Sequence, residues 1–261
     1  MDGRPIRPGL IRDRAPVGAD DHMTAVYHLN VNCSDLTASS AFYVDRLGFT
    51  PVIHTAPTEP QPGHAFGLDR AQWEAWLLEG GQPGPLVDLL QWQLPPPVPA
   101  ALTGMGWRSL ELTHPSINEA TADPDGVPIM IARGPATALV GARVRSVDPD
   151  RAVAFHCEVM GMRRADDPGC VVDDNGFTIA FDRADEVSGA TPPAPANRVG
   201  IFRMAMLTDD LDGRYRRLVE RGVHCLSPPA TLRMGPGLPP LRALLFRGPD
   251  GNVLELIEPP G

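Results

Sequence analysis

A repeated pattern constrains this chain more than any single residue does. A short apolar strand, an aspartate, a short amphipathic segment and a glycine follow one another in residues 27–49, in residues 141–162 and in residues 203–223. A unit of this kind cannot bury its apolar face alone, so it must pair with copies of itself. The sequence therefore predicts an α+β protein built from paired units.

Composition excludes several classes of protein. The 261 residues carry a formal net charge of −9 and no basic run, so we expect no nucleic-acid partner. No apolar stretch approaches the roughly 20 residues that a membrane-spanning helix needs. Residues 1–22 lack the apolar core of a secretory signal and are predicted to form a flexible extension. The four cysteines are scattered without a Cys-x-x-Cys pair, which is typical of reduced thiols in a cytoplasmic protein.

Four units can be traced along the chain. The first has the order β-α-β-β-β, with strands expected at 24–33, 51–55, 72–78 and 86–92. Asp35 stands at the expected N-cap of its helix. The second unit is contracted: it has strands at 107–113 and 127–132, a short helix at 116–122, and no middle strands. The third unit begins near residue 139 and the fourth spans residues 199–258, with proline-rich segments between units.

Two stretches of sequence carry a resemblance to a known family. They are His28-Leu29-Asn30-Val31 with Asp35 and Leu47-Gly48-Phe49, and the segment at 249–258 (PDGNVLELIE). Together they resemble the vicinal oxygen chelate superfamily, which includes glyoxalase I, bleomycin-resistance proteins, fosfomycin-resistance enzymes and extradiol dioxygenases. The resemblance implies two tandem domains, at residues 23–135 and 136–261, each made of two βαβββ units.

The resemblance also implies a metal site. In that family a divalent metal lies inside each cup, held by a His from a first strand and a Glu from a fourth strand, and it polarises two neighbouring substrate oxygens. Fe, Mn, Ni, Zn or Co would suit such ligands. The corresponding positions, unit by unit, are His28 and Asp88, Ser109 and Met130, Gly141 and Ala180, and Arg203 and Glu255. The ligand set is therefore incomplete. The expected ligands are His28, Asp88 and Glu111, which lies on the same strand face as Ser109 and could substitute for it.

Each of these residues has a second interpretation. His28 is either a metal ligand or general base, or a buried, hydrogen-bonded histidine. Asp88 interrupts an apolar strand and therefore needs a partner, which is either a ligand or a nearby arginine. Glu111 either completes the ligand set or faces solvent. Because a guanidinium cannot ligate a metal, Arg203 is expected either to pair with Glu255 across the cup or to clamp a substrate carboxylate.

The tryptophans suggest where a ligand would lie. All four fall in the first half of the chain. Trp73, Trp92 and Trp107 are expected, with Arg203 and Glu255, to contact a substrate in an apolar cup; the alternative is that the indoles are ordinary core.

Two functions of different classes follow. The first is an enzyme of the lyase, isomerase or oxygenase type that acts on a small oxygenated molecule in the N-terminal cup. Its catalytic residues, His28 and Asp88, either hold a metal or, in a metal-free enzyme, act directly as base and acid. The second is a non-catalytic antibiotic-binding protein that resembles bleomycin-resistance proteins. We favour the enzyme, in bacterial specialised metabolism, with a small-molecule partner and a homodimer as one expected assembly.

Overall fold

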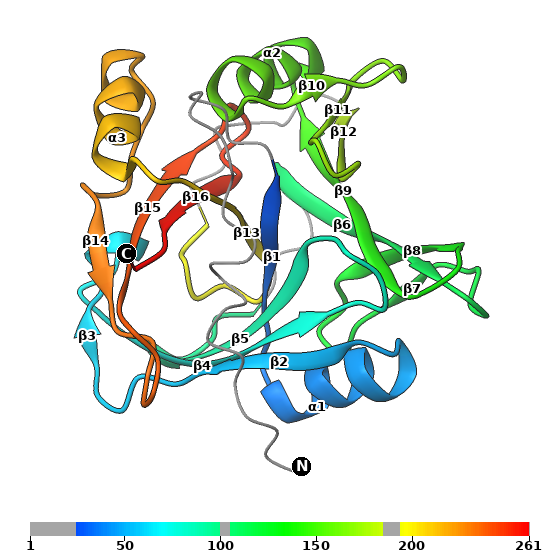
Figure 1. Ribbon diagram of the computed structural model, residues 1–261, viewed down its shortest axis with the longest axis horizontal. Coiled ribbons are helices and arrows are strands. Elements are labelled where there is room, and N and C mark those ends of the chain that lie inside the picture. Colours follow the sequence, from blue (N-terminus) through cyan, green and yellow to red (C-terminus); the bar gives the residue numbers. More distant parts are fainter. Residues whose placement is uncertain (1–24, 100–104, 185–193, 261) are drawn as a thin grey trace.

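The structure is a computed structural model, which describes residues 25–99, 105–184 and 194–260. The extension expected at residues 1–22 lies outside the described residues. Two curled sheets form the molecule (Figure 1). One has nine strands, in the order β14-β15-β16-β13-β1-β5-β4-β2 with β3 on β4, and the other has the order β10-β11-β12-β9-β6-β8-β7.

The elements of the nine-stranded sheet come from the two ends of the chain. The first unit supplies β1 (Val26–Asn32), α1 (Leu36–Ala41), a π-helical turn (Phe42–Arg46), β2 (Thr50–Thr55), β3 (Gln61–Pro62), a 3₁₀ turn (His64–Phe66), β4 (Arg70–Glu79) and β5 (Leu86–Leu94). The fourth unit supplies β13 (Gly200–Leu207), α3 (Leu211–Glu220), β14 (Ala230–Leu232), β15 (Leu241–Arg247) and β16 (Val253–Glu258).

The second sheet comes from the middle of the chain. The second unit supplies β6 (Gly106–His114), β7 (Thr121–Ala122) and β8 (Pro128–Arg133). The third unit supplies β9 (Ala138–Ser146), α2 (Pro149–Met160), β10 (Arg163–Arg164), β11 (Cys170–Val172) and β12 (Thr178–Arg183). The helix expected at residues 116–122 is wrong: this segment is irregular before β7, and its first backbone N–H groups, those of Ser116 and Ile117, donate to His114 Nδ1.

The repeated local pattern has a common physical cause. In each complete unit an aspartate caps the helix after the first strand: Asp35 accepts from Ala38 N, Asp148 from Arg151 N and Asp210 from Gly213 N. After each helix a glycine with positive φ reverses the chain. The predicted N-cap at Asp35 is thus confirmed.

The pairing of the units differs from the expected one. β1 pairs antiparallel with β13, which joins the first unit to the fourth, and β6 pairs antiparallel with β9, which joins the second to the third. Neither residues 23–135 nor residues 136–261 therefore close a cup of their own. Only residues 134–137 separate β8 from β9, and a connection this short places the third unit beside the second. The fourth unit pairs with the first.

Two proline-rich segments that link units also pair with each other. Val98 N donates to Asn197 O at 2.9 Å, and Val199 N donates back to Val98 O at 2.9 Å. The Asn197 side chain donates to Pro96 O at 2.7 Å. These bonds hold the exit of the first unit against the entry of the fourth, next to the sheet that the two units share.

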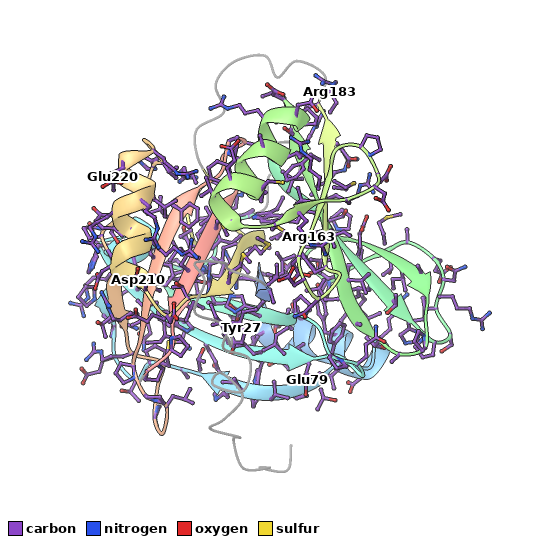
Figure 2. The ribbon with its side chains drawn as sticks, turned by 45° about the horizontal axis from the view of Figure 1, so that its top comes forward. Tyr27, Glu79, Arg163, Arg183, Asp210 and Glu220 are labelled. Atoms are coloured by element: carbon purple, nitrogen blue, oxygen red, sulfur yellow. The ribbon has the colours of Figure 1, made fainter. Side chains whose placement is uncertain are left out.

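The two sheets pack through their central strands. One core cluster contains Leu29 of β1, Leu110 of β6, Val144 of β9 and Met204 of β13. Figure 2 shows α2 lying over the seven-stranded sheet and α3 beside β15 and β16. A second core cluster, which includes Trp73, fills the concave side of the nine-stranded sheet. Within the described residues, no helix combines the length and apolar character needed to cross a membrane.

Candidate functional site

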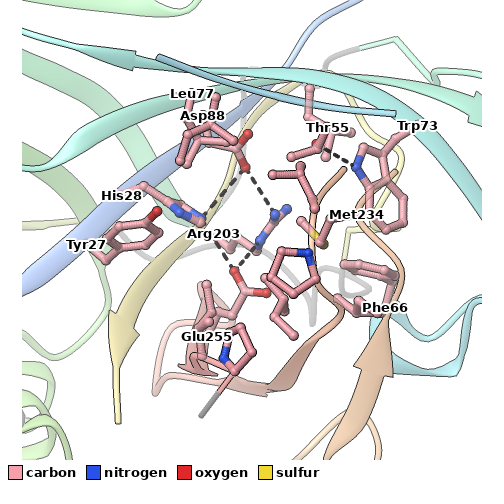
Figure 3. A pocket seen from close by; sticks show the side chains of 18 residues that line it. Tyr27, His28, Thr55, Phe66, Trp73, Leu77, Asp88, Arg203, Met234 and Glu255 are labelled. Carbon is pink, nitrogen blue, oxygen red and sulfur yellow. Dashed lines mark hydrogen bonds and ion pairs between the residues drawn. The ribbon is translucent and has the colours of Figure 1, made fainter. Parts of the chain in front are cut away.

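Four polar side chains meet inside the cup of the nine-stranded sheet (Figure 3). They are His28 on β1, Asp88 on β5, Arg203 on β13 and Glu255 on β16. Their exposed fractions are 4%, 2%, 6% and 2%. Because buried charges are costly unless they are paired, a cluster of this kind must be held together by its own contacts.

The register of the first strands makes His28 and Arg203 equivalent. His28 lies opposite Ala205 across the β1–β13 ladder, and Arg203 lies opposite Asn30. The residue two positions after His28 is Asn30, which lies opposite Arg203. The residue two positions after Arg203 is Ala205, which lies opposite His28. This reciprocity is what a twofold axis between the two strands produces.

The fourth strands obey the same symmetry. Asp88 lies beside Asn30 in the parallel β1–β5 ladder, and Glu255 lies beside Ala205 in the parallel β13–β16 ladder. The two carboxylates therefore occupy equivalent positions on either side of the axis. The correspondence of the four positions, which was expected only from a resemblance, is present in the backbone itself.

The contacts among the four side chains form a closed ring (Figure 3). Arg203 Nε donates to Glu255 Oε2 at 2.6 Å, and Arg203 Nη2 donates to Asp88 Oδ2 at 3.1 Å. His28 Nε2 lies 3.5 Å from Glu255 Oε2 and 3.7 Å from Asp88 Oδ2. These two distances are too long for strong hydrogen bonds. Asn30 Nδ2 also donates to Asp88 Oδ2, at 3.0 Å, and so fixes that carboxylate.

Some polar atoms of the ring have no hydrogen-bond partner among the described residues. They are both ring nitrogens of His28, Oδ1 of Asp88 and Nη1 of Arg203. Buried polar atoms are rarely left unpaired in a folded protein, and such atoms at a cavity wall point to a ligand or water. The ring thus contains a donor, an acceptor and an imidazole whose hydrogen-bonding capacity is not used by the described residues.

The opposite charges of Arg203 and its two carboxylate partners stabilise one another. Burial by itself lowers the pKa of the Arg203 guanidinium, but the Glu255 and Asp88 carboxylates more than offset this and raise it. Burial likewise raises the pKa of the Glu255 carboxyl, but the Arg203 charge and His28 outweigh it and hold that pKa below its ordinary value. Arg203 and Glu255 are therefore both charged near neutral pH.

The ring forms the polar end of an apolar cavity of about 60 Å³. Trp73 and Phe66 line it from the first unit, and Leu232, Met234 and Leu238 line it from the fourth. Trp73 is held by a hydrogen bond from its Nε1 to Thr55 Oγ1 at 3.1 Å. The segment that carries Met234 is tied across the cup, because Ala56 N donates to Met234 O at 2.9 Å. The cavity suits a small molecule with one polar end.

The four residues do not fit a divalent metal. Arg203 has no lone pair to give, and it holds the oxygens of Asp88 and Glu255 that a metal would need. Within the part of the chain that the structure describes, no group of three His, Cys, Asp or Glu side chains is arranged to hold a metal ion. The expected ligand set of His28, Asp88 and Glu111 is corrected for a second reason: Glu111 lies on β6, in the other sheet.

The second cup has the same backbone plan but a different set of side chains. Glu111 lies beside Met130 in the parallel β6–β8 ladder and opposite Gly141 in β9, so the register repeats that of the first cup. The four positions equivalent to the ring are Ser109, Met130, Gly141 and Ala180. Glu111 instead joins Arg143, whose Nη1 donates to it at 3.0 Å and whose Nε donates to Asp182 at 2.8 Å. The Arg143 side chain is 39% exposed, so this network is a surface feature.

Only some of the residues predicted to contact substrate lie at the cavity. Trp73, Arg203 and Glu255 line the cavity. Trp92 is fully buried, packs against Trp73, and donates from Nε1 to Asn32 Oδ1 at 3.2 Å. Trp107 belongs to β6 and donates to Val253 O at 3.3 Å, on the rim of a different hollow. Trp92 and Trp107 therefore have structural contacts and are not part of the cavity wall.

Sequence reasoning missed Asn30 and the residues Met234 and Leu238. Asn30 follows His28 by two positions on a strand, so the same face was readable from the period of the strand. The loop that carries Met234 and Leu238 has no periodic signal, because prolines and glycines dominate residues 235–240.

The fold and the site together define a class. Paired βαβββ units build a cup with four converging side chains at symmetry-related positions and an apolar chamber beside them, which is the plan of a small-molecule site. A sequence model of the Glyoxalase/Bleomycin resistance protein/Dioxygenase superfamily matches residues 138–256.

Solved structures with the same fold cover nearly the whole chain. Glyoxalase I from Zea mays is 16% identical, with a TM-score of 0.59 and coverage of 90% of this chain and 92% of that one. A mutant of the same maize enzyme gives 17% identity, a TM-score of 0.61 and coverage of 90% and 94%. A candidate dioxygenase from Bacillus subtilis is 16% identical, with a TM-score of 0.65 and coverage of 93% and 87%. No curated protein matches. A model of this superfamily matches the third and fourth units, and the solved structures share the fold of nearly the whole chain, which supports the resemblance predicted from the sequence.

Proposed function

We propose that the protein is an enzyme that moves a proton on a small, uncharged, oxygenated molecule bound in the cavity beside His28. The observation that carries the proposal is the buried imidazole of His28, which has no hydrogen-bond partner among the described residues and lies at the polar end of the cavity. An imidazole is the side chain best suited to take and return a proton near neutral pH. Its two neighbouring carboxylates, which lie 3.5 and 3.7 Å from Nε2, would stabilise the imidazolium that forms.

Arg203 supplies the positive charge for such a reaction. Its Nη1 has no partner among the described residues, so it can donate to a carbonyl or hydroxyl oxygen that gains negative charge as the proton leaves. Glu255 and Asp88 hold the guanidinium in place, so little reorganisation accompanies the reaction. Of the reaction classes that the sequence suggested, isomerisation and elimination are the ones that these four side chains support directly.

The charge of the ring indicates an uncharged substrate. The ring holds two acidic side chains against one guanidinium, and all four groups are buried. A substrate carboxylate would add a further negative charge in a poorly hydrated site. Arg203 was expected to clamp such a carboxylate, but two of its three nitrogens already bind Glu255 and Asp88. We therefore favour aldehydes, ketones and hydroxy-ketones over acids.

The test is hydrogen exchange at the carbon next to a carbonyl group. Wild-type protein is incubated in D₂O with a panel of small ketones, hydroxy-ketones and dicarbonyl compounds, and ¹H NMR follows the loss of C–H signals and the growth of product. The His28→Gln variant should lower the rate for an active compound by at least about 100-fold, the usual contribution of a general base. The matched control is His54→Gln, since His54 stacks on Trp76 outside the cavity, and it should stay within about twofold of wild type.

Two results would contradict the proposal. One is exchange that survives the His28→Gln substitution. The other is binding without exchange: compounds that quench Trp73 fluorescence but are neither exchanged nor converted would favour the binding-protein alternative.

A further inference from the structure

We propose that the Arg203 guanidinium has replaced a divalent metal ion at the centre of the cup, and that the single substitution Arg203→His turns the ring into a divalent-metal site. The inference concerns the architecture of the ring. Its readout is metal binding, which does not depend on the proposed activity.

The spacing of the donor atoms carries the first step. His28 Nε2 lies 3.5 Å from Glu255 Oε2 and 3.7 Å from Asp88 Oδ2. Ligands that bind one metal at about 2.1 Å in a tetrahedral arrangement are separated by about 3.4 Å. The imidazole and the two carboxylate oxygens therefore already have nearly the separation of atoms that share one cation.

Symmetry carries the second step. Arg203 is related to His28, and Glu255 to Asp88, by the twofold register of the strands. A histidine at position 203 would therefore approach the centre from the side opposite His28. Two imidazoles and two carboxylates then surround one point, which is a donor set that suits Zn²⁺, Co²⁺, Ni²⁺ or Mn²⁺.

Charge explains why the wild-type ring would not also accept a metal. The Asp88 and Glu255 oxygens that a metal would take are those that bind Arg203. A metal that took them would leave a buried guanidinium without a counter-charge, which is strongly unfavourable. The guanidinium thus satisfies the two carboxylates and blocks the ion at the same time.

The experiment is a titration of purified, metal-stripped protein with Zn²⁺ by calorimetry and with Co²⁺ by visible absorption. Arg203→His should bind one equivalent of each metal at least 100-fold more tightly than wild type, and Co²⁺ should give the visible bands of a site with nitrogen and oxygen ligands. Adding His28→Ala to Arg203→His should abolish this gain. Arg203→Gln removes the charge without supplying an imidazole, so it should bind at least tenfold more weakly than Arg203→His.

Several results would overturn the inference. The first is tight, stoichiometric binding by wild type that is lost in His28→Ala. The second is equal affinity in Arg203→His and Arg203→Gln. Circular dichroism and thermal unfolding establish that each variant is folded; if Arg203→His does not fold, Arg203→Cys supplies a smaller ligand at the same position, and its failure to bind while folded would likewise overturn the inference.

Discussion

Replacing Arg203 with methionine tests whether the ring holds the nine-stranded sheet together. Methionine keeps much of the volume but removes the charge, which leaves the Asp88 and Glu255 carboxylates buried at 2% exposure without their cation. Removing one partner of a buried ion pair costs about 3–5 kcal/mol, because the other charge stays desolvated. We therefore expect Arg203→Met to lower the free energy of unfolding by about that amount at pH 7.

The chain contains its own control. Arg143 also bonds to two carboxylates, Asp182 and Glu111, in the other sheet, but its side chain is 39% exposed against 7% for Arg203. Solvent-exposed ion pairs contribute about 0–1 kcal/mol. Arg143→Met should therefore cost no more than about 1 kcal/mol. The two variants differ in burial more than in the number of bonds lost.

Urea unfolding followed by tryptophan fluorescence measures both effects. With a slope of up to about 3 kcal/mol per molar, Arg203→Met should lower the midpoint by more than about 1 M, and Arg143→Met by a few tenths. Adding Glu255→Gln to Arg203→Met should restore part of the loss, since one unpaired charge is removed. The deficit of Arg203→Met should also shrink from pH 7 to pH 5, because the unpaired carboxylates take up protons. Equal costs for the two arginine variants would refute the reasoning.

Two further predictions concern other parts of the fold. Burial lowers the pKa of His156 from 6.5 to about 4, so the unfolded chain takes up this proton at a higher pH than the folded protein does. The free energy of unfolding should therefore fall by up to about 3 kcal/mol as the pH drops from 6.5 to 4. His156→Asn should flatten that part of a stability-against-pH curve, and an unchanged slope would exclude His156 as its source. The Gln61 side chain makes two hydrogen bonds of 2.9 Å with the Arg233 backbone beside the cavity. Gln61→Ala should therefore speed amide hydrogen exchange in residues 232–238, while exchange in α2 stays the same. Slow exchange in both segments would show that Gln61 does not hold residues 232–238 in place.

The local parts of the fold could be predicted from the sequence. Asp35 at the N-cap and the run around Asp88 are signals that act within one element, and the structure confirms the capping bond and the strand. His28 Nε2 lies 3.7 Å from Asp88 Oδ2 because the two residues belong to β1 and β5, which are neighbouring strands of one unit. Such features depend on short separations along the chain, where hydrophobic period and capping chemistry decide.

The pairing of units could not be predicted in this way. The second and third units share one sheet, and the first and fourth share the other, because four similar units present similar edges. Which edges join depends on connection lengths and on contacts such as that of Val98 with Asn197, which no local pattern records. The pairing explains why Glu111 and Trp107, both on β6, lie away from the cavity, and why Arg203 and Glu255 lie inside it.

The central claim is that Arg203 bridges Asp88 and Glu255 where a metal ion would otherwise lie. Crystals grown with Mn²⁺ or Zn²⁺ test it directly, through anomalous diffraction measured at the absorption edge of the metal. The account predicts a guanidinium within about 3 Å of both carboxylates and no anomalous peak between His28 and Glu255. A peak about 2.1 Å from His28 Nε2 and from a Glu255 oxygen, with Arg203 turned out of the ring, would contradict it.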